Sequence, residues 1–205
     1  MPLIHTIQIN AVTKVGIWEI TEPEAYFLEN IRLQKNVTHP YKRVQHLAGR
    51  QLLRSLAPDF PVNAIQVSAS GKPCLKGAAY EFSISHSENY AAVIVSQQCC
   101  VGIDVEKITP KLKRVAPKFL NEAERLHAGP SLEWYALCWS AKEAVYKWHG
   151  KKGVDFRAHI HLQPFRPRKA GTLDAVFRRE GYEKPLQLHY RVSPAFVLVW
   201  VQAPT

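Results

Sequence analysis

Two segments of the chain carry apolar patterns that predict helices. In residues 41–56 they fall at Val44, Leu47, Ala48, Leu52 and Leu56, and residues 132–148 carry a second, largely apolar run of helical length. Spacings of three and four residues place such side chains on one face of a helix. The pattern therefore predicts one helix at 41–56 and another at 132–148.

Shorter segments with alternating or continuous apolar residues predict strands. In the first half of the chain these are residues 65–67, 81–85 and 90–96, and in the second half 154–162, 172–178, 186–192 and 195–201. Residues 111–126 follow Thr109-Pro110 and are typical of one or two helices. The expected fold class is therefore α+β.

A weak internal duplication divides the chain into two similar halves. Each half has one long helix followed by strands, and Leu-Ala-Gly-Arg at 47–50 can be laid over Trp-Ser-Ala-Lys at 139–142. The overlay brings Arg50 and Lys142 to the same place. The connector at 101–105 is the expected boundary, which gives domains 1–103 and 104–205.

Three carboxylates in the second half are candidate ligands for a hard metal ion. Asp104 and Glu106 are two apart, so on an extended segment both point to one side. Magnesium binds oxygen ligands and commonly takes a few carboxylates, while phosphates and water complete its shell. On a helix, Glu143 shares a face with Lys147. The alternative is two solvated acids and an ordinary surface pair.

Two segments of the first half carry further candidate chemistry. Gly71-Lys72-Pro73 is typical of a turn that brings a cation close to a ligand. Residues 82–87 alternate, which predicts a strand with a hydroxyl at Ser85 and an imidazole at His86 near its end. Without a Gly-x-Ser-x-Gly elbow, a hydrolase with Ser85 as nucleophile is disfavoured. A structural role for His86 stays open.

Composition indicates a cell compartment but does not identify the activity. The chain has 205 residues, 46% of them hydrophobic, and a formal net charge of +10. That charge implies an anionic partner, whether nucleic acid, a phosphorylated cofactor or an acidic protein. The chain has no known nucleic-acid-binding motif, and its four cysteines lack zinc or disulfide-framework spacing. Without a leader or membrane-length apolar run, a cytoplasmic protein with no membrane association is expected.

Four motifs, taken together, carry a resemblance to a known family. They are Gly71-Lys72-Pro73, Ser83-Ile84-Ser85-His86, residues 101–106 (Val-Gly-Ile-Asp-Val-Glu) and residues 139–147 (Trp-Ser-Ala-Lys-Glu-Ala-Val-Tyr-Lys). Their order and spacing resemble the 4′-phosphopantetheinyl transferase superfamily over residues 43–153. The length is similar to the monomeric, surfactin-synthetase-activating (Sfp-like) type.

The resemblance implies a fold and a reaction. The fold would be two α/β halves related by a pseudo-twofold axis, with coenzyme A in the cleft between them. The reaction would be the magnesium-dependent transfer of the 4′-phosphopantetheine group from coenzyme A to a serine of an apo acyl or peptidyl carrier protein. Its products would be the holo carrier protein and adenosine 3′,5′-bisphosphate.

The resemblance also implies catalytic roles in the second half. Asp104, Glu106 and Glu143 would hold Mg²⁺. Lys147 would contact the pyrophosphate and Lys142 a nearby phosphate. Either Glu143 or a metal-bound water would accept the serine proton.

Five residues of the first half match positions that line coenzyme A in the family. Lys72, Pro73, Ser85 and His86 would line the nucleotide, with His86 reaching a phosphate. Arg50 would bind the 3′-phosphate, although a helix-surface role for this arginine stays open.

Two other classes of protein remain alternatives, and the partner follows from charge. One is a non-catalytic coenzyme A- or nucleotide-binding module, and the other a nucleic-acid-binding protein suggested by charge alone. The transferase interpretation predicts an acidic carrier protein as partner of a monomer. Basic clusters at 111–114 and 151–152 are the expected docking rim.

Overall fold

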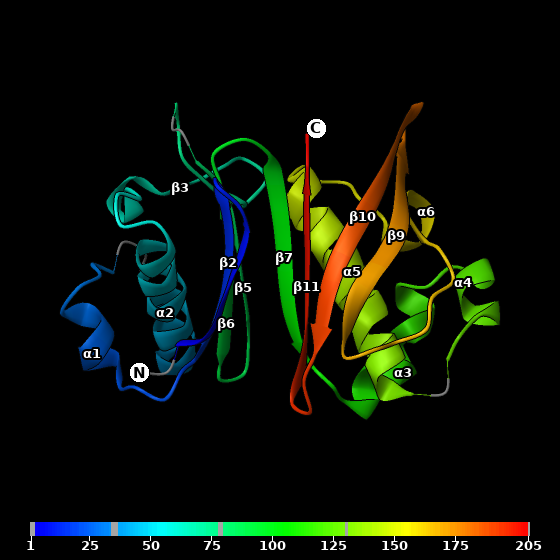
Figure 1. The fold of residues 1–205 in the computed structure, drawn as a ribbon, viewed down its shortest axis with the longest axis horizontal. Helices are drawn as coiled ribbons and strands as arrows, with labels where there is room; N and C mark the ends of the chain where they lie inside the picture. The colour runs from blue at the N-terminus through cyan, green and yellow to red at the C-terminus, as the bar shows by residue number, and fades with distance from the viewer. Residues whose placement is uncertain (1–2, 34–36, 78–79, 130, 205) are drawn as a thin grey trace. The chain divides into compact units, whose positions relative to one another are not determined.

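The computed structural model describes residues 3–33, 37–77, 80–129 and 131–204 of the chain. The chain divides into two compact units, Met1–Val101 and Gly102–Ala203, which we call the first and second unit (Figure 1). Both combine helices with β-sheet, so the mixed helix and sheet content expected from the sequence is confirmed.

The first unit is built on a four-stranded antiparallel sheet in the order β1-β2-β6-β5, with a separate pair β3-β4. Its elements are β1 (Leu3–Asn10), β2 (Thr13–Glu19), α1 (Glu24–Leu28), α2 (Pro40–Leu56), η1 (Val62–Ala64), β3 (Gln66–Val67), β4 (Pro73–Cys74), β5 (Glu81–Ser87) and β6 (Tyr90–Ser96). Helix α2 runs along one face of this sheet (Figure 1).

The apolar face of α2 forms the core of the first unit. Leu47, Ala48 and Leu52 are fully buried in this core, as the spacing predicted, and Leu53 is buried with them. Pro40 lies in the first turn of the helix, where a proline costs no hydrogen bond. The sequence analysis missed β1 and β2, although Val15 and Ile17 of β2, which are both buried, alternate as strand residues do.

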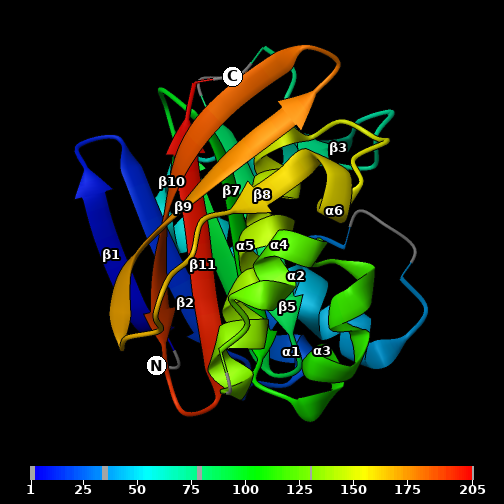
Figure 2. The ribbon, with the colours of Figure 1, turned by 90° about the vertical axis from the view of Figure 1, so that its right-hand side faces the viewer.

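The second unit is built on a five-stranded sheet in the order β7-β11-β10-β9-β8. Its elements are β7 (Cys100–Lys107, which begins in the first unit), α3 (Pro110–Val115), η2 (Ala116–Lys118), α4 (Glu122–Leu126), α5 (Leu132–His149), α6 (Phe156–His159), β8 (Ile160–Leu162), β9 (Ala170–Arg179), β10 (Tyr182–Val192) and β11 (Phe196–Ala203). Helices α3, α4 and α5 lie on one side of this sheet (Figure 2).

Helix α5 approaches β7 so closely that only glycine fits at one position. A Cβ atom on Gly102 would lie 1.9 Å from the carbonyl oxygen of Ala144 and 2.7 Å from the amide nitrogen of Trp148. The helix begins after Ser131, whose hydroxyl accepts from the Trp134 amide, and ends at Gly150 in the left-handed conformation. The expected helix at 132–148 is thus confirmed.

The strand expected over residues 154–162 is corrected by the structure. Asp155 caps a short helix instead, because its Oδ1 accepts hydrogen bonds from the amides of Arg157 and Ala158 at 2.8 and 2.9 Å. That helix is α6, and only Ile160–Leu162 forms a strand. Aspartate is a strong helix cap, and its side chain overrode the apolar pattern of the segment.

Over the described part of the chain, no helix combines the length and the apolar content needed to cross a lipid bilayer.

Candidate functional site

Two elements of the second unit bring the predicted acids together. Strand β7 supplies Asp104 and Glu106, while α5 supplies Glu143 and Lys147. Lys147 Nζ donates to Asp104 Oδ1 at 2.7 Å, and the Asp104 side chain is 7% exposed. The backbone contact at Gly102 explains why the helix and the strand lie close enough for this ion pair. The close packing at Gly102 therefore accounts for the proximity of the motif on β7 to the motif on α5.

The charges of these residues act on one another. The pKa of Glu143 is raised to about 6, because burial raises it most, Lys147 lowers it, and the carboxylates of Asp104 and Glu106 raise it. Electrostatic effects of this kind require the groups to lie near one another. The structure thus places Asp104, Glu106, Glu143 and Lys147 in one neighbourhood, while their roles stay predictions.

The donor chemistry of this neighbourhood suits a hard divalent cation. Three carboxylates repel one another and favour a compensating positive charge, which Lys147 supplies at Asp104. Within the described ranges, however, no three acidic, histidine or cysteine side chains are gathered closely enough to hold a metal ion. The residue types fit magnesium, and the three-ligand set stays a prediction.

Lys142 does not lie where a phosphate-binding lysine is expected. Its side chain has no exposed surface, and Nζ donates to Glu124 Oε2, the Phe156 carbonyl and the Ile160 carbonyl at 2.8, 2.8 and 2.7 Å. An ammonium group has three protons, and all three are used inside the second unit. This arrangement argues against the predicted phosphate contact, because the side chain of Lys142 points into the core and its three protons are already donated.

A cavity of about 330 Å³ in the first unit gathers several of the predicted coenzyme A residues. Its lining consists of His46, Arg50, Ile65, Val67, Gly71, Pro73, Ile84 and His86. Arg50, Pro73 and His86 were predicted from the sequence. His46 was missed, although it lies four residues before Arg50 and therefore on the same face of α2.

Arg50 is a buried cation that lies beside an imidazole. It is 7% exposed, and its Nη1 lies 3.1 Å from His46 Nδ1. Burial lowers the pKa of Arg50 to about 10, so it remains protonated at neutral pH. Among the described residues no hydrogen-bond partner is found for its Nε. A guanidinium in this state is suited to an anionic ligand entering the cavity.

The other two predicted residues lie differently. Ser85 is 5% exposed, whereas its neighbour His86 is exposed and lines the cavity. Side chains of consecutive strand residues point to opposite faces, so Ser85 lies on the face of β5 opposite to Ile84 and His86. Lys72 is half-buried, and burial lowers its pKa, while Glu81 raises it. Lys72 and Ser85 are not part of the cavity lining.

The second unit carries the match to a known family. Residues 100–198 match the 4′-phosphopantetheinyl transferase superfamily. This segment contains β7, α5 and all four groups of the acidic neighbourhood.

Individual relatives agree with this family match. The 4′-phosphopantetheinyl transferase HetI of Nostoc sp. is 31% identical over 153 residues, which are 66% of this chain and 65% of the relative. The 4′-phosphopantetheinyl transferase AcpT of Salmonella typhimurium is 32% identical over 118 residues, 53% of this chain and 60% of the relative. A Haemophilus influenzae protein named for the same activity is 29% identical over 143 residues, 64% and 60% of the two chains. The chain thus spans three fifths to two thirds of the length of these relatives.

Proposed function

We propose that this protein is a magnesium-dependent 4′-phosphopantetheinyl transferase that acts on an apo acyl or peptidyl carrier protein. The observation that carries the proposal is the acidic neighbourhood of Asp104, Glu106 and Glu143 with Lys147, in a segment that matches the superfamily. A binding module that relied on cations alone would gain little from three acids beside a pyrophosphate.

The proposed reaction is a phosphoryl transfer. The serine hydroxyl oxygen of the carrier attacks the β-phosphorus of coenzyme A, and the bond to the oxygen of the adenosine 3′,5′-bisphosphate breaks. Bound magnesium would neutralise charge on the pyrophosphate. Asp104, Glu106 and Glu143 would hold the ion.

Two residues of α5 are assigned roles in charge and proton movement. Lys147 would stabilise charge on the leaving phosphate once it exchanges its pairing with Asp104 for the pyrophosphate. Glu143 is the preferred acceptor of the serine proton, because α5 can place it between the metal site and the acceptor serine.

The cavity of the first unit is proposed to receive the nucleotide end of coenzyme A. Arg50 and His86 offer a guanidinium and an imidazole to phosphates, while Pro73 and Ile84 supply apolar surface. Contacts from Lys72 and Ser85 remain predictions. We assign Lys142 no contact with the substrate.

Several finer features belong to the proposal and rest on the sequence. They are the division into halves 1–103 and 104–205, their pseudo-twofold relation with coenzyme A between them, the Sfp-like subtype, a monomeric state and a cytoplasmic location. An acidic carrier as partner rests on the net charge of +10.

Mass spectrometry of an apo carrier protein tests the proposal directly. Incubation with coenzyme A, magnesium and this protein should add one phosphopantetheine mass to the carrier serine. A chelator should prevent the gain, and Asp104→Ala should reduce it by orders of magnitude while leaving the protein folded. Coenzyme A binding without any transfer to acyl and peptidyl carriers would instead support the non-catalytic module.

A further inference from the structure

A buried ion pair connects the helix of the proposed catalytic residues to three neighbouring elements. Lys142 on α5 and Glu124 on α4 have side chains that are 0% and 4% exposed, and their charged atoms are 2.8 Å apart. The other two protons of Lys142 go to the carbonyls of Phe156 in α6 and Ile160 in β8. We call Lys142 and Glu124 the buried brace.

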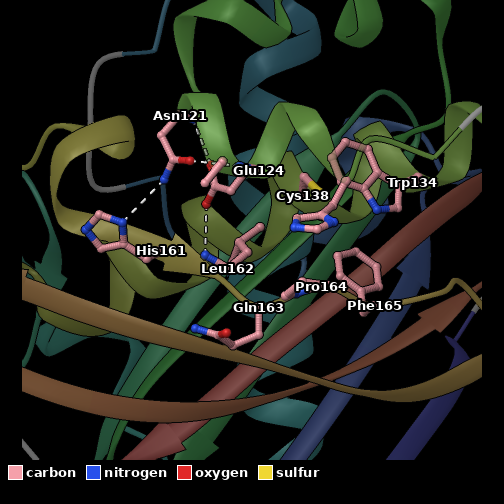
Figure 3. Close-up of a pocket in the computed structure, with 11 residues that line it drawn as sticks. Asn121, Glu124, Trp134, Cys138, His161, Leu162, Gln163, Pro164 and Phe165 are labelled. Atoms are coloured by element: carbon pink, nitrogen blue, oxygen red, sulfur yellow. Dashed lines mark hydrogen bonds between the residues drawn. The ribbon is translucent and has the colours of Figure 1, made fainter.

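Glu124 is held as firmly as Lys142. Its Oε2 also accepts from the Asn121 amide at 2.8 Å, and its Oε1 accepts from the Leu162 amide at 2.8 Å. Figure 3 shows Glu124 between Asn121 and Leu162, at the wall of a cavity of about 320 Å³. Fully satisfied buried networks of this kind fix one arrangement of the elements that they join.

The brace lies next to the proposed general base in the sequence. Glu143 follows Lys142 directly, and on its other side Ala144 presents its carbonyl to β7 at Gly102. Both neighbours of Glu143 are therefore anchored, one to α4, α6 and β8 and the other to the strand that carries Asp104.

An aromatic contact fixes the same stretch of α5 from α6. The ring of Phe156, whose carbonyl accepts from Lys142, lies 5.7 Å from the Trp139 ring and 5.9 Å from the Tyr146 ring. Trp139 and Tyr146 lie four residues before and three residues after Glu143, so they flank it on one face of the helix.

We propose that Lys142 and Glu124 are positioning residues that hold Glu143 in register with Asp104 and Glu106, and that neither contacts the substrate. This assignment rests on the proposed transferase function. Lys142 would act through the backbone of α5, because its side chain cannot reach solvent or a phosphate in this arrangement. A displacement of about 1 Å at a catalytic group can cost about a hundredfold in rate, so the orientation of α5 matters.

A double variant separates positioning from simple loss of stability. Lys142→Met with Glu124→Gln removes both charges together, which avoids leaving one charge buried without its partner. The matched control is Arg178→Met with Glu183→Gln, an exposed pair at 2.7 Å in the same unit. Both proteins are studied at a temperature where circular dichroism shows them to be folded.

The expected result is a split between catalysis and coenzyme A binding. The brace variant should lose about tenfold or more in kcat and need several-fold more magnesium for half-maximal rate, with a KM for coenzyme A within about twofold of wild type. The control variant should match wild type in all three. A folded brace variant with wild-type kcat and wild-type magnesium dependence would overturn the proposal, even if it melts at a lower temperature.

A binding measurement separates this proposal from the proposed function. Mn²⁺, a spectroscopic substitute for magnesium, is titrated by electron paramagnetic resonance without carrier protein. The brace variant should bind Mn²⁺ several-fold more weakly than wild type. Equal affinities would overturn the positioning role, whereas wild-type protein that binds Mn²⁺ but transfers nothing would count against the transferase and not against the brace. Wild-type protein that binds no Mn²⁺ would overturn both.

Discussion

Among the described residues, each unit buries one cation on the helix that covers its sheet, and the two cations differ in their hydrogen-bond partners. On α2, Nη1 of Arg50 lies within hydrogen-bond distance of Nδ1 and the carbonyl oxygen of His46, and Arg50 lines a cavity of about 330 Å³. Lys142 on α5 has three acceptors, one of them the Glu124 carboxylate. The two positions coincide when residues 47–50 are laid over residues 139–142.

The comparison of Arg50 with Lys142 indicates which buried charge is available to a ligand. A buried charge is costly unless something compensates it. The charge of Lys142 is compensated by the Glu124 carboxylate, so we expect it to contribute to stability and to the position of α5. Arg50 has no carboxylate partner among the described residues, so we expect an anionic ligand to compensate its charge.

The largest expected effect is on stability. Lys142→Met leaves the Glu124 carboxylate buried without its cation and should lower the free energy of unfolding by about 3–5 kcal/mol. Arg50→Met removes a cation that pairs with no described carboxylate, and should change it by no more than about 1 kcal/mol. Urea unfolding of both variants measures the difference. Equal losses would mean that the two charges are compensated alike.

A methyl group should destabilise the helix–sheet contact at Gly102 in the second unit more than the one at Gly49 in the first. A Cβ on Gly102 would lie 1.9 Å from backbone, whereas a Cβ on Gly49 would lie 2.8 Å from Cγ2 of the Ile84 side chain. Gly102→Ala should therefore cost about 3 kcal/mol or more and abolish transfer, and Gly49→Ala about 1–2 kcal/mol. Thermal unfolding and carrier modification report the two effects. Full activity in Gly102→Ala would contradict the close packing of α5 on β7.

For coenzyme A binding, in contrast to stability, the substitution at Arg50 should have the larger effect. Arg50→Ala should weaken coenzyme A by about 10- to 100-fold, because a charge-assisted hydrogen bond to a phosphate contributes about 1.5–3 kcal/mol. Dephospho-coenzyme A should be affected much less if the contact is to the 3′-phosphate. Isothermal titration calorimetry with both ligands gives the answer. If neither ligand binds more weakly to the variant, Arg50 has only a structural role.

Glu143 should make the stability of the metal-free protein depend on pH. Its folded pKa of about 6 lies above the ordinary value of 4.5, so folding favours the protonated form. The resulting stabilisation, at most about 2 kcal/mol, is full below pH of about 4.5 and is lost as pH rises through about 6. Glu143→Gln should lack this contribution, while a variant of the exposed Glu122 to Gln should keep it. Denaturant unfolding across this pH range distinguishes them.

The smallest effect concerns the exposed cations of α3. Lys111, Lys113 and Arg114 are exposed, so their charges are available to a partner and are screened by solvent. Reversal of all three to Glu should raise the apparent KM for the carrier several-fold, with coenzyme A affinity unchanged. The effect should fade with added salt, because the Debye length is about 8–10 Å at ordinary ionic strength. An unchanged carrier KM would remove α3 from the docking rim.

The sequence alone predicted the elements whose signal is periodic. Helix α2 carries apolar residues at helical spacing and α5 is a long, largely apolar run, so their positions followed from the pattern. The strand expected at residues 154–162 was wrong because one side chain, Asp155, capped a helix within it. Local hydrogen bonds of this kind leave little trace in hydrophobic periodicity.

For the site, the sequence determined which groups are present, and tertiary structure decided which of them can act. The motifs identified Asp104, Glu106, Glu143 and Lys147 because their spacing fixes the face on which they lie. The same motif gave no sign that Lys142 is buried, since its acceptors come from α4, α6 and β8, as far as eighteen residues away along the chain. Charge is a property of a residue, but its availability to a ligand depends on which distant atoms fold around it.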